Sequence, residues 1–172
     1  MTVHTTIDSP IGPLLLVGEE PATPGGPVAL AWLTMAGQKN APAIRPEWVH
    51  RPAAFAGIAA QLDAYFAGEL TEFDVPFADS GTGSDFRQRI WDALMAVPYG
   101  TTTTYGEIAR RLGVPRAEVR ALGAAIGANP VSIVRPCHRV IGADGSLRGY
   151  AGGLERKRDL LTLEGALQPM LG

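Results

Sequence analysis

The sequence predicts an α+β protein with two parts. We expect a small N-terminal α/β domain with a short antiparallel sheet at residues 1–79, and a mostly helical C-terminal domain with a helix-turn-helix at residues 80–172. Strand-like segments and a Pro/Gly-rich loop fill the first part, and helical spacing dominates after the segment "DSGTGS". The charge divides in a similar way, because residues 1–100 carry 5 basic and 11 acidic side chains and the remainder carries 10 basic and 6 acidic.

The N-terminal part reads as a small sheet with one helix. In residues 4–20, apolar and polar side chains alternate weakly around two turns, which predicts strands. Residues 27–35, "PVALAWLTM", predict a further strand after the loop "PATPGGP". Residues 53–67 place apolar side chains at helical spacing, with a stop at Gly68. Residues 70–78, "LTEFDVPFA", predict one more short strand.

The C-terminal part begins with a helix that Ser84 can cap. Its residues Phe86, Ile90 and Leu94 fall four apart, and the helix is expected to end before Pro98. Short helices are expected to follow it.

Two of these short helices form a candidate helix-turn-helix. In "TYGE", Thr104 can accept from the Glu107 amide while the Glu107 side chain reaches back, a capping box that starts a helix over residues 105–112. Gly113 ends that helix, and Pro115 suits the first turn of a second one that runs through "RAEVRALGAAIGA" to an Asn-Pro pair.

Most residues of the second helix are Ala or Gly, so few large side chains project from it. Its backbone can approach another surface closely, with Arg120 standing out near its start. DNA contact and tight packing against a neighbouring helix explain the small residues equally well. In the same way, the nine arginines among the ten cations after residue 100 suit phosphate contacts, and a solvated helix face explains them too.

The sequence predicts neither a membrane protein nor an exported one. No apolar run approaches the roughly 20 residues that cross a bilayer, and "MTVHTTIDSP" lacks the basic and then apolar layout of a secretory signal. The one cysteine cannot form an internal disulfide, and with one histidine beside it cannot complete a four-ligand zinc site. We therefore expect a cytoplasmic protein with a reduced thiol, no metal and no cofactor.

The single cysteine, Cys137, stands in "IVRPCHRVIG". A thiol with a pKa of about 8.5 is mostly protonated at neutral pH and needs a base. Neighbouring side chains on an extended chain face opposite sides, so His138 can take the proton only through a turn or an intervening water; Pro136 can supply such a break after a strand at residues 131–135. A small buried hydrophobe is the alternative for this cysteine, whereas the flanking arginines favour a reactive thiol.

The region around this cysteine also resembles a known family. "PCHRVIG", followed by "GYAGG" and a terminal helix ending "LLTLEG", is similar to the active-site region of the O6-alkylguanine-DNA alkyltransferases, or methylated-DNA-protein-cysteine methyltransferases. The similarity extends through "FRQRIWDALMAVPYGTTTTYGEIA" and "RALGAAIGANP", so it covers residues 84–165 in order, and it continues more weakly through "IDSPIGPLLL" and "LDAYFAGELTEFDVP". The resemblance implies a variable N-terminal α/β domain and a helical C-terminal domain with a helix-turn-helix.

The resemblance also implies a reaction: an alkyl group on the O6 atom of guanine in DNA is transferred irreversibly to Cys137, after the nucleotide is flipped out of the duplex. His138 resembles the water-linked base of this family, and Glu164 resembles the carboxylate that holds it. Tyr105 resembles the residue that protonates the departing guanine or hydrogen-bonds to it. Asn129 resembles the hinge that ties the recognition helix to the cysteine segment.

Further positions follow from the same resemblance. Arg120 resembles the finger that enters the duplex, and Tyr150 and Ala151, with Gly152, resemble the loop that shapes the guanine pocket. The other expected DNA contacts are Thr104, Ala121, Gly123, Ala124 and Arg139. The expected partner is double-stranded DNA that contains O6-alkylguanine, bound by a monomer, and cooperative binding stays open.

Three departures from the family pattern stand out: Val119 replaces the usual alanine, the turn before Arg120 is one residue longer, and Arg135 occupies a position that is normally aliphatic.

Two other classes of protein remain open. One is a non-catalytic lesion sensor, against which Cys137 argues, because related alkyltransferase-like proteins have another residue at that position. The other is a cysteine hydrolase or thiol oxidoreductase; a redox cycle would lack a resolving cysteine. The range of alkyl groups and the role of the N-terminal domain are not predicted.

Overall fold

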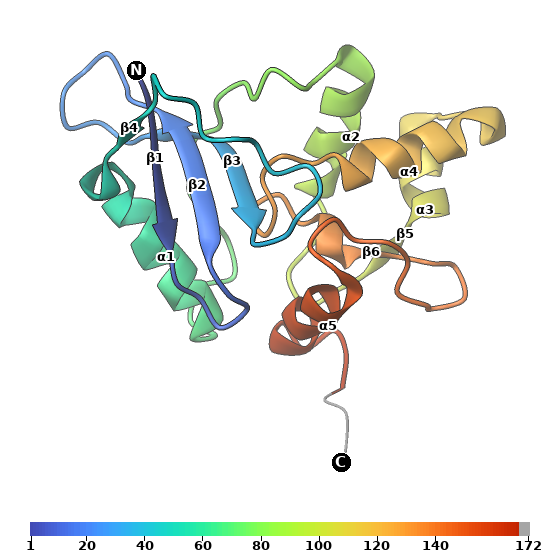
Figure 1. Ribbon diagram of the computed structural model, residues 1–172. Helices are drawn as coiled ribbons and strands as arrows, with labels where there is room; N and C mark the ends of the chain where they lie inside the picture. Colours follow the sequence, from blue (N-terminus) through green and yellow to red (C-terminus); the bar gives the residue numbers. More distant parts are fainter. Residues whose placement is uncertain (169–172) are drawn as a thin grey trace. The chain divides into compact units, whose positions relative to one another are not determined.

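The computed structural model describes residues 1–168, which fold as two compact units (Figure 1). The N-terminal unit contains Met1–Thr82 and also Pro130–Val134, and the C-terminal unit contains Gly83–Asn129 and, among the described residues, 135–168. The predicted α+β class, with a small antiparallel sheet and a helical second part, is confirmed. The boundary between residues 79 and 80 stays a prediction, and the assignment of Pro130–Val134 to the first unit was not foreseen from the sequence.

The N-terminal unit is built on a four-stranded sheet in the order β3-β2-β1-β4. β1 and β2 form an antiparallel hairpin, β3 pairs antiparallel with β2, and β4 pairs parallel with β1. The register shifts between Val17 and Gly18, where a Cβ on the glycine would lie 2.6 Å from the carbonyl oxygen of Ala29, so only glycine fits there. The strands are β1 (Thr2–Ile7), β2 (Leu14–Glu19), β3 (Ala29–Met35) and β4 (Val49–His50).

One helix lies alongside this sheet (Figure 1). α1 (Ala56–Phe66) follows the 3-10 helix η1 (Pro52–Phe55), and it buries Ile58, Leu62 and Tyr65 at helical spacing. The helix predicted over residues 53–67 is therefore confirmed.

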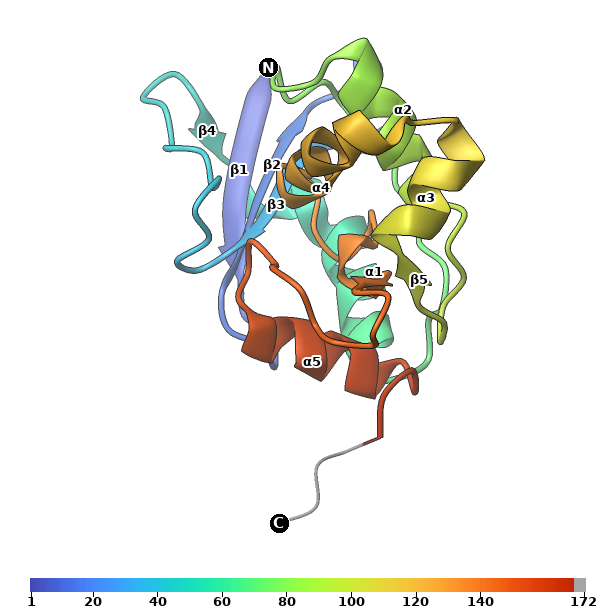
Figure 2. The same cartoon turned by 90° about the vertical axis from the view of Figure 1, so that its right-hand side faces the viewer.

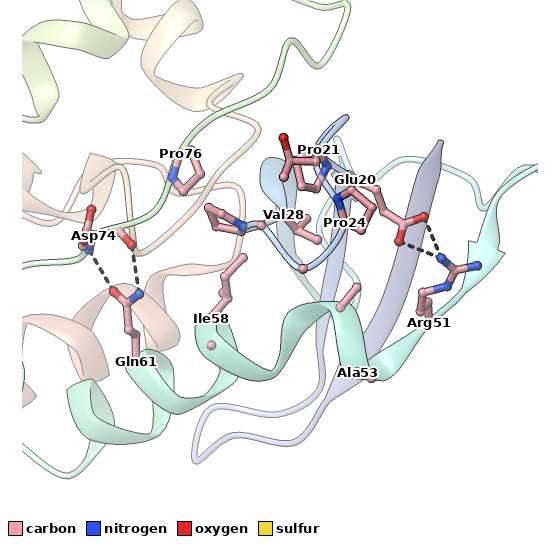
Figure 3. Close-up of a pocket in the computed structure, with 16 residues that line it drawn as sticks. Glu20, Pro21, Pro24, Val28, Arg51, Ala53, Ile58, Gln61, Asp74 and Pro76 are labelled. Carbon is pink, nitrogen blue, oxygen red and sulfur yellow. Dashed lines mark hydrogen bonds and ion pairs between the residues drawn. The ribbon is translucent and has the colours of Figure 1, made fainter.

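A pocket of about 660 Å³ lies beside α1 (Figure 3). The loop of residues 20–28 and the helix line it. Gln61 is tied to the backbone of Asp74 by hydrogen bonds of 2.8 and 3.0 Å, and Arg51 donates to the carboxylate of Glu20 at 2.6 Å. The pocket contains none of the residues that the sequence singles out as a site.

The strand predicted at residues 70–78 is wrong. Within this segment only Phe77 forms an isolated bridge, to Leu30, with hydrogen bonds from Leu30 N to Pro76 O at 2.8 Å and from Ala78 N to Leu30 O at 2.9 Å. Pro76 has no N–H to donate, so a longer ladder cannot form around it.

Three helices pack together in the C-terminal unit (Figure 2). Both predicted N-terminal caps are present, because Ser84 Oγ accepts from Arg87 N and Thr104 Oγ1 accepts from Glu107 N, each at 3.1 Å. The second half of the predicted capping box is wrong, since the Glu107 carboxylate instead accepts from Arg110 at 2.7 Å. The helices are α2 (Asp85–Leu94), α3 (Tyr105–Leu112) and α4 (Val119–Gly127).

The turn between α3 and α4 has the expected residues. Gly113 ends α3 in the left-handed conformation, with φ of 67°. Pro115 precedes a short 3-10 helix, η2 (Arg116–Glu118), which leads into α4. The α3–η2–α4 segment, residues 105–127, is thus two helices joined by a Gly- and Pro-containing turn.

The rest of the C-terminal unit surrounds the cysteine. η3 (Cys137–Arg139) leads into β6 (Val140–Ile141), which pairs parallel with β5 (Thr103–Thr104), and α5 (Leu154–Leu163) packs against η3. In residues 1–168, no helix combines the length and the apolar character that crossing a bilayer demands.

The strand predicted at residues 131–135 is also wrong. Val131 makes a single bridge to Leu33, and the chain then turns at Ile133, whose φ is 71°. A positive φ is strained for a β-branched residue and ends regular strand pairing. The hydrogen bond from Val134 N to Ser132 O at 2.8 Å closes this tight turn.

Candidate active site

The cysteine lies on a second tight turn. Pro136 has φ of −81° and ψ of 63°, and the Cys137 N–H donates to the carbonyl of Arg135 at 2.8 Å, which is the geometry of an inverse γ-turn. The 3-10 helix η3 follows directly, so Cys137 and His138 are not on opposite faces of a strand. The turn that their cooperation requires is therefore present.

His138 is held by a buried carboxylate. Its Nε2 lies 2.7 Å from Glu164 Oε2, and neither side chain is exposed to solvent. Glu164 ends α5 and also accepts from Arg139, whose Nε donates to Oε1 at 2.8 Å and whose second guanidinium nitrogen donates to Oε2 at 3.1 Å. Because Arg139 donates to both oxygens, the carboxylate is ionised, and His138 Nε2 carries the hydrogen.

The other imidazole nitrogen is therefore a lone-pair acceptor. His138 Nδ1 is buried, and none of the protein groups in residues 1–168 hydrogen-bonds to it. Burial lowers the pKa of His138, although Glu164 opposes this, so the ring is neutral near pH 7 and able to accept a proton. The chemistry of this nitrogen fits a base that works through a water.

The thiol of Cys137 is buried among apolar side chains, with 6% of the residue exposed. Burial raises the pKa of Cys137, and a hydrogen bond from Asn129 and the positive charges of Lys157 and Arg135 act in the opposite direction. In this state the sulfur is held as a thiol, surrounded by groups that favour its anion.

Asn129 joins the end of α4 to the cysteine segment. Its Nδ2 donates to the carbonyl of Arg135 at 2.8 Å, and its side chain also hydrogen-bonds to the thiol of Cys137. The Asn129 side chain therefore links the end of α4 to the backbone just before the cysteine.

Two tyrosines pack against the apolar cluster that contains Cys137. Tyr105 begins α3 and is half-buried; burial, and then the proximity of Cys137, raise the pKa of its phenol, so it stays protonated and able to donate. Tyr150 belongs to the loop before α5 with Ala151 and Gly152, and it is half-buried as well. The Tyr105 phenol thus lies near the cysteine, and the loop of Tyr150 packs against the same cluster.

The residues expected to contact DNA differ in their exposure to solvent. Arg120, Ala121 and Ala124 are exposed on α4, and Gly123 is partly covered, with its Cα hydrogen directed toward the ring of Tyr105. Thr104 is half-buried, where its hydroxyl caps α3.

Arg139 does not belong with them, and the expectation that it contacts DNA is wrong. It is 7% exposed, and its guanidinium donates to Glu164 and to the carbonyl of Val97 at 2.7 Å. A side chain used in this way is the structural partner of the carboxylate, and it has no free face for phosphate.

Two further cations, Lys157 and Arg135, are buried, and Lys157 was missed from the sequence. Lys157 has no exposed surface, and its Nζ donates to the carbonyl oxygens of Val140 and Arg148. Burial lowers the pKa of Lys157 to about 8. Arg135, which the sequence left without an explanation, is 6% exposed and stacks over Trp91, with its Cζ 5.2 Å from the ring centroid. Lys157 would be taken for a surface residue from its type alone, and only the departure of Arg135 from the family pattern marked that position.

Together, these features define a protein with a buried cysteine, an imidazole–carboxylate pair beside it and a helix pair that ends at the same site. Sequence comparison is more specific. The profile described as 6-O-methylguanine DNA methyltransferase, DNA binding domain, matches residues 85–166, and that described as 6-O-methylguanine DNA methyltransferase, ribonuclease-like domain, matches residues 2–78. The chain belongs to the 6-O-methylguanine DNA methyltransferase family.

Its relatives cover nearly its whole length. A methylated-DNA-protein-cysteine methyltransferase of Mycobacterium tuberculosis is 53% identical over 98% of this chain and 96% of its own, and one of Methanosarcina acetivorans is 45% identical over 95% and 98%. The crystal structure of Mycobacterium tuberculosis OGT in complex with DNA matches with a TM-score of 0.81 at 51% identity, covering 95% of this chain and 93% of that one.

Proposed function

We propose that this chain repairs DNA by transferring the alkyl group from the O6 position of guanine to the sulfur of Cys137. The enzyme class is methylated-DNA-protein-cysteine methyltransferase. The observation that carries the proposal is the buried set of Cys137, His138 and Glu164 in a chain of this family, with 2.7 Å between the imidazole and the carboxylate. The relatives' names and the DNA complex of the mycobacterial protein support it.

The reaction is a displacement at carbon. His138 Nδ1 takes the thiol proton through one water, and Glu164 stabilises the imidazolium that forms. The thiolate forms a new S–C bond while the O6–C bond breaks, and the electron pair of that bond remains on the guanine. Tyr105 donates a hydrogen bond or a proton to the departing base, because a neutral guanine is a better leaving group than its anion.

The product at Cys137 is a thioether, and no second thiol is available to remove the group. Each molecule therefore repairs one lesion and is consumed, with no metal or cofactor. A reduced thiol suits the cytoplasm, and we expect the protein to act as a monomer.

DNA binding is assigned to the α3–η2–α4 segment acting as a helix-turn-helix, with α4 as the recognition helix. The exposed Ala121 and Ala124 allow the backbone of α4 to approach the duplex, and Arg120 fills the space left by the extruded nucleotide. The flipped base is bound between Tyr105 and the loop of Tyr150, Ala151 and Gly152.

The direct test is to incubate the protein with a duplex that contains one O6-methylguanine and to weigh the intact protein and its cysteine peptide. We expect one methyl group on the Cys137 peptide, a stoichiometry of one, and no gain in a Cys137→Ser variant. A lesion sensor would bind the same duplex and gain no mass, and a hydrolase would turn over an ester substrate many times. Either result would refute the proposal.

A further inference from the structure

The side chain of Arg135 is not used by the reaction described above, yet it lies inside the site. The residue is 6% exposed and lies two positions before the acceptor cysteine. In the alkyltransferase family this position is normally aliphatic. Its burial lowers the pKa of Arg135, because a cation is less stable away from water. A buried charge at such a place is weak evidence for stability, since an apolar residue of similar size is often as stable or more so.

Several contacts fix the position of Arg135. Its backbone carbonyl accepts from Asn129 Nδ2 and from Cys137 N, each at 2.8 Å. Its guanidinium stacks over Trp91, whose Nε1 donates to the carbonyl of Ala125 in α4 at 2.8 Å. The planar group is therefore held by an aromatic face that is itself fixed to the end of the recognition helix.

The charge of Arg135 acts on two neighbours. Trp91, on which the guanidinium stacks, belongs to the same buried cluster as Cys137, so the charge is held in the surroundings of the sulfur. In agreement with this placement, the positive charge of Arg135 lowers the pKa of Cys137, against the larger effect of burial, and Asp92 of α2 is its other charged neighbour. The other ionisable groups around the sulfur are Lys157 from α5, Tyr105 from α3 and the adjacent His138. Lys157 and Arg135 are the cations whose charge favours the thiolate. Lys157 also donates hydrogen bonds to two backbone carbonyls, so replacing it would disturb the fold. The effect of charge on the sulfur is therefore better tested at Arg135.

We propose that Arg135 is a positioning residue that holds a fixed positive charge beside Cys137, by stacking on Trp91, and so favours the reactive thiolate. This inference rests on the proposed function of Cys137 as the acceptor. It explains why a buried cation replaces an aliphatic side chain, since its benefit lies in the ionised sulfur and not in folding.

The test compares Arg135→Leu, Arg135→Gln and Arg135→Lys in the full chain, with Arg158→Leu as a control at an exposed position of α5. Thiolate formation is followed by ultraviolet absorbance against pH, with the Cys137→Ser protein subtracted. Benzyl transfer from free O6-benzylguanine is then timed over the same pH range, and urea unfolding gives the stability.

We expect both neutral variants to raise the thiolate midpoint by about half a pH unit, so that transfer below the midpoint slows about threefold. The rate at high pH should equal that of the parent protein, and Arg135→Lys should restore most of the midpoint. Stability should be unchanged or higher in Arg135→Leu.

The inference is overturned if both neutral variants keep the parent midpoint, or if they lose rate equally at every pH. Failure of the proposed function would look different, because the parent protein would then take no benzyl or methyl group. The absorbance titration would still report on Arg135 in that case.

Discussion

The imidazole of His138 and the carboxylate of Glu164 are 2.7 Å apart, and neither side chain has any exposed surface. The pair comes from two elements that lie 26 residues apart in the chain, the 3-10 helix of the cysteine and the end of α5. Its burial means that no solvent competes for the hydrogen bond, so the imidazole keeps one tautomer and one orientation.

Replacing Glu164 by Gln should damage both activity and stability. The amide cannot stabilise an imidazolium, and it leaves Arg139 as a buried cation without its carboxylate. We expect benzyl transfer from free O6-benzylguanine to slow by roughly tenfold or more, and the free energy of unfolding to fall by about 3 kcal/mol. Timed benzyl-transfer reactions measure the rate, and urea unfolding measures the free energy of unfolding. Glu155→Gln, at an exposed position of the same helix, should change neither.

Replacing Arg120 by Ala should separate duplex repair from the chemical step. Extrusion of a base costs a few kcal/mol, and the arginine is proposed to offset part of it. We expect repair of a methylated duplex to slow by roughly tenfold or more, since about 1.4 kcal/mol is one factor of ten. Reaction with free O6-benzylguanine should be unchanged. Arg158→Ala, exposed on α5 and outside the α3–η2–α4 segment, is the control, and equal losses on both substrates would exclude the finger role.

A negative charge on α4, the proposed recognition helix, should weaken DNA binding without changing the surroundings of the thiol. Ala124 is exposed on α4, so Ala124→Glu should leave the fold intact and lower affinity for duplex DNA by roughly tenfold at low salt through repulsion of phosphate. Fluorescence anisotropy at two salt concentrations measures this loss, which should shrink as salt increases. Ala60→Glu, exposed on α1, is the matched substitution. Equal affinities for the two variants would argue against α4 as the DNA-facing helix.

Burial of Lys157 should appear in the pH dependence of stability. The pKa of Lys157 is about 8 in the folded protein and 10.5 when unperturbed, so between these values the unfolded chain binds more protons. Stability must therefore rise with pH over this window, by up to about 3 kcal/mol, and the penalty is fully present below pH 8.

The measurement uses a Cys137→Ser background, so that the thiol does not titrate. Urea unfolding from pH 8 to pH 10.5 should show the rise in the parent, and Lys157→Met should abolish the part that belongs to this side chain. Lys39→Met, at an exposed position, should keep the full rise. A parent slope that survives Lys157→Met would show that another group titrates.

The sequence predicted the helices well and the short strands poorly. The helix of residues 105–112 was placed correctly because Thr104 and Gly113 mark its two ends by local chemistry. The segment around Ile133 is rich in β-branched residues, and its positive φ depends on tertiary surroundings that no local pattern reports.

The residues of the site were likewise predicted only in part. The cysteine, histidine and glutamate were predicted through resemblance; all three are buried, and His138 and Glu164 lie 2.7 Å apart. Arg139 was listed with the DNA contacts through the resemblance, and its pairing with Glu164 was not visible in the local sequence. Lys157 was missed for the same reason. Buried charges are recognised only when their partners are known.

The sulfur of Cys137 packs in the same apolar cluster as Ile90, Leu122 and Val140, which has consequences for the spent molecule. A close-packed interior tolerates extra carbon atoms poorly, and inserting them typically costs about 1–3 kcal/mol. Once alkylated, the protein should melt at a lower temperature than the fresh one, and a benzyl adduct should lower it more than a methyl adduct. Loss of conformational stability would then mark used molecules for proteolysis.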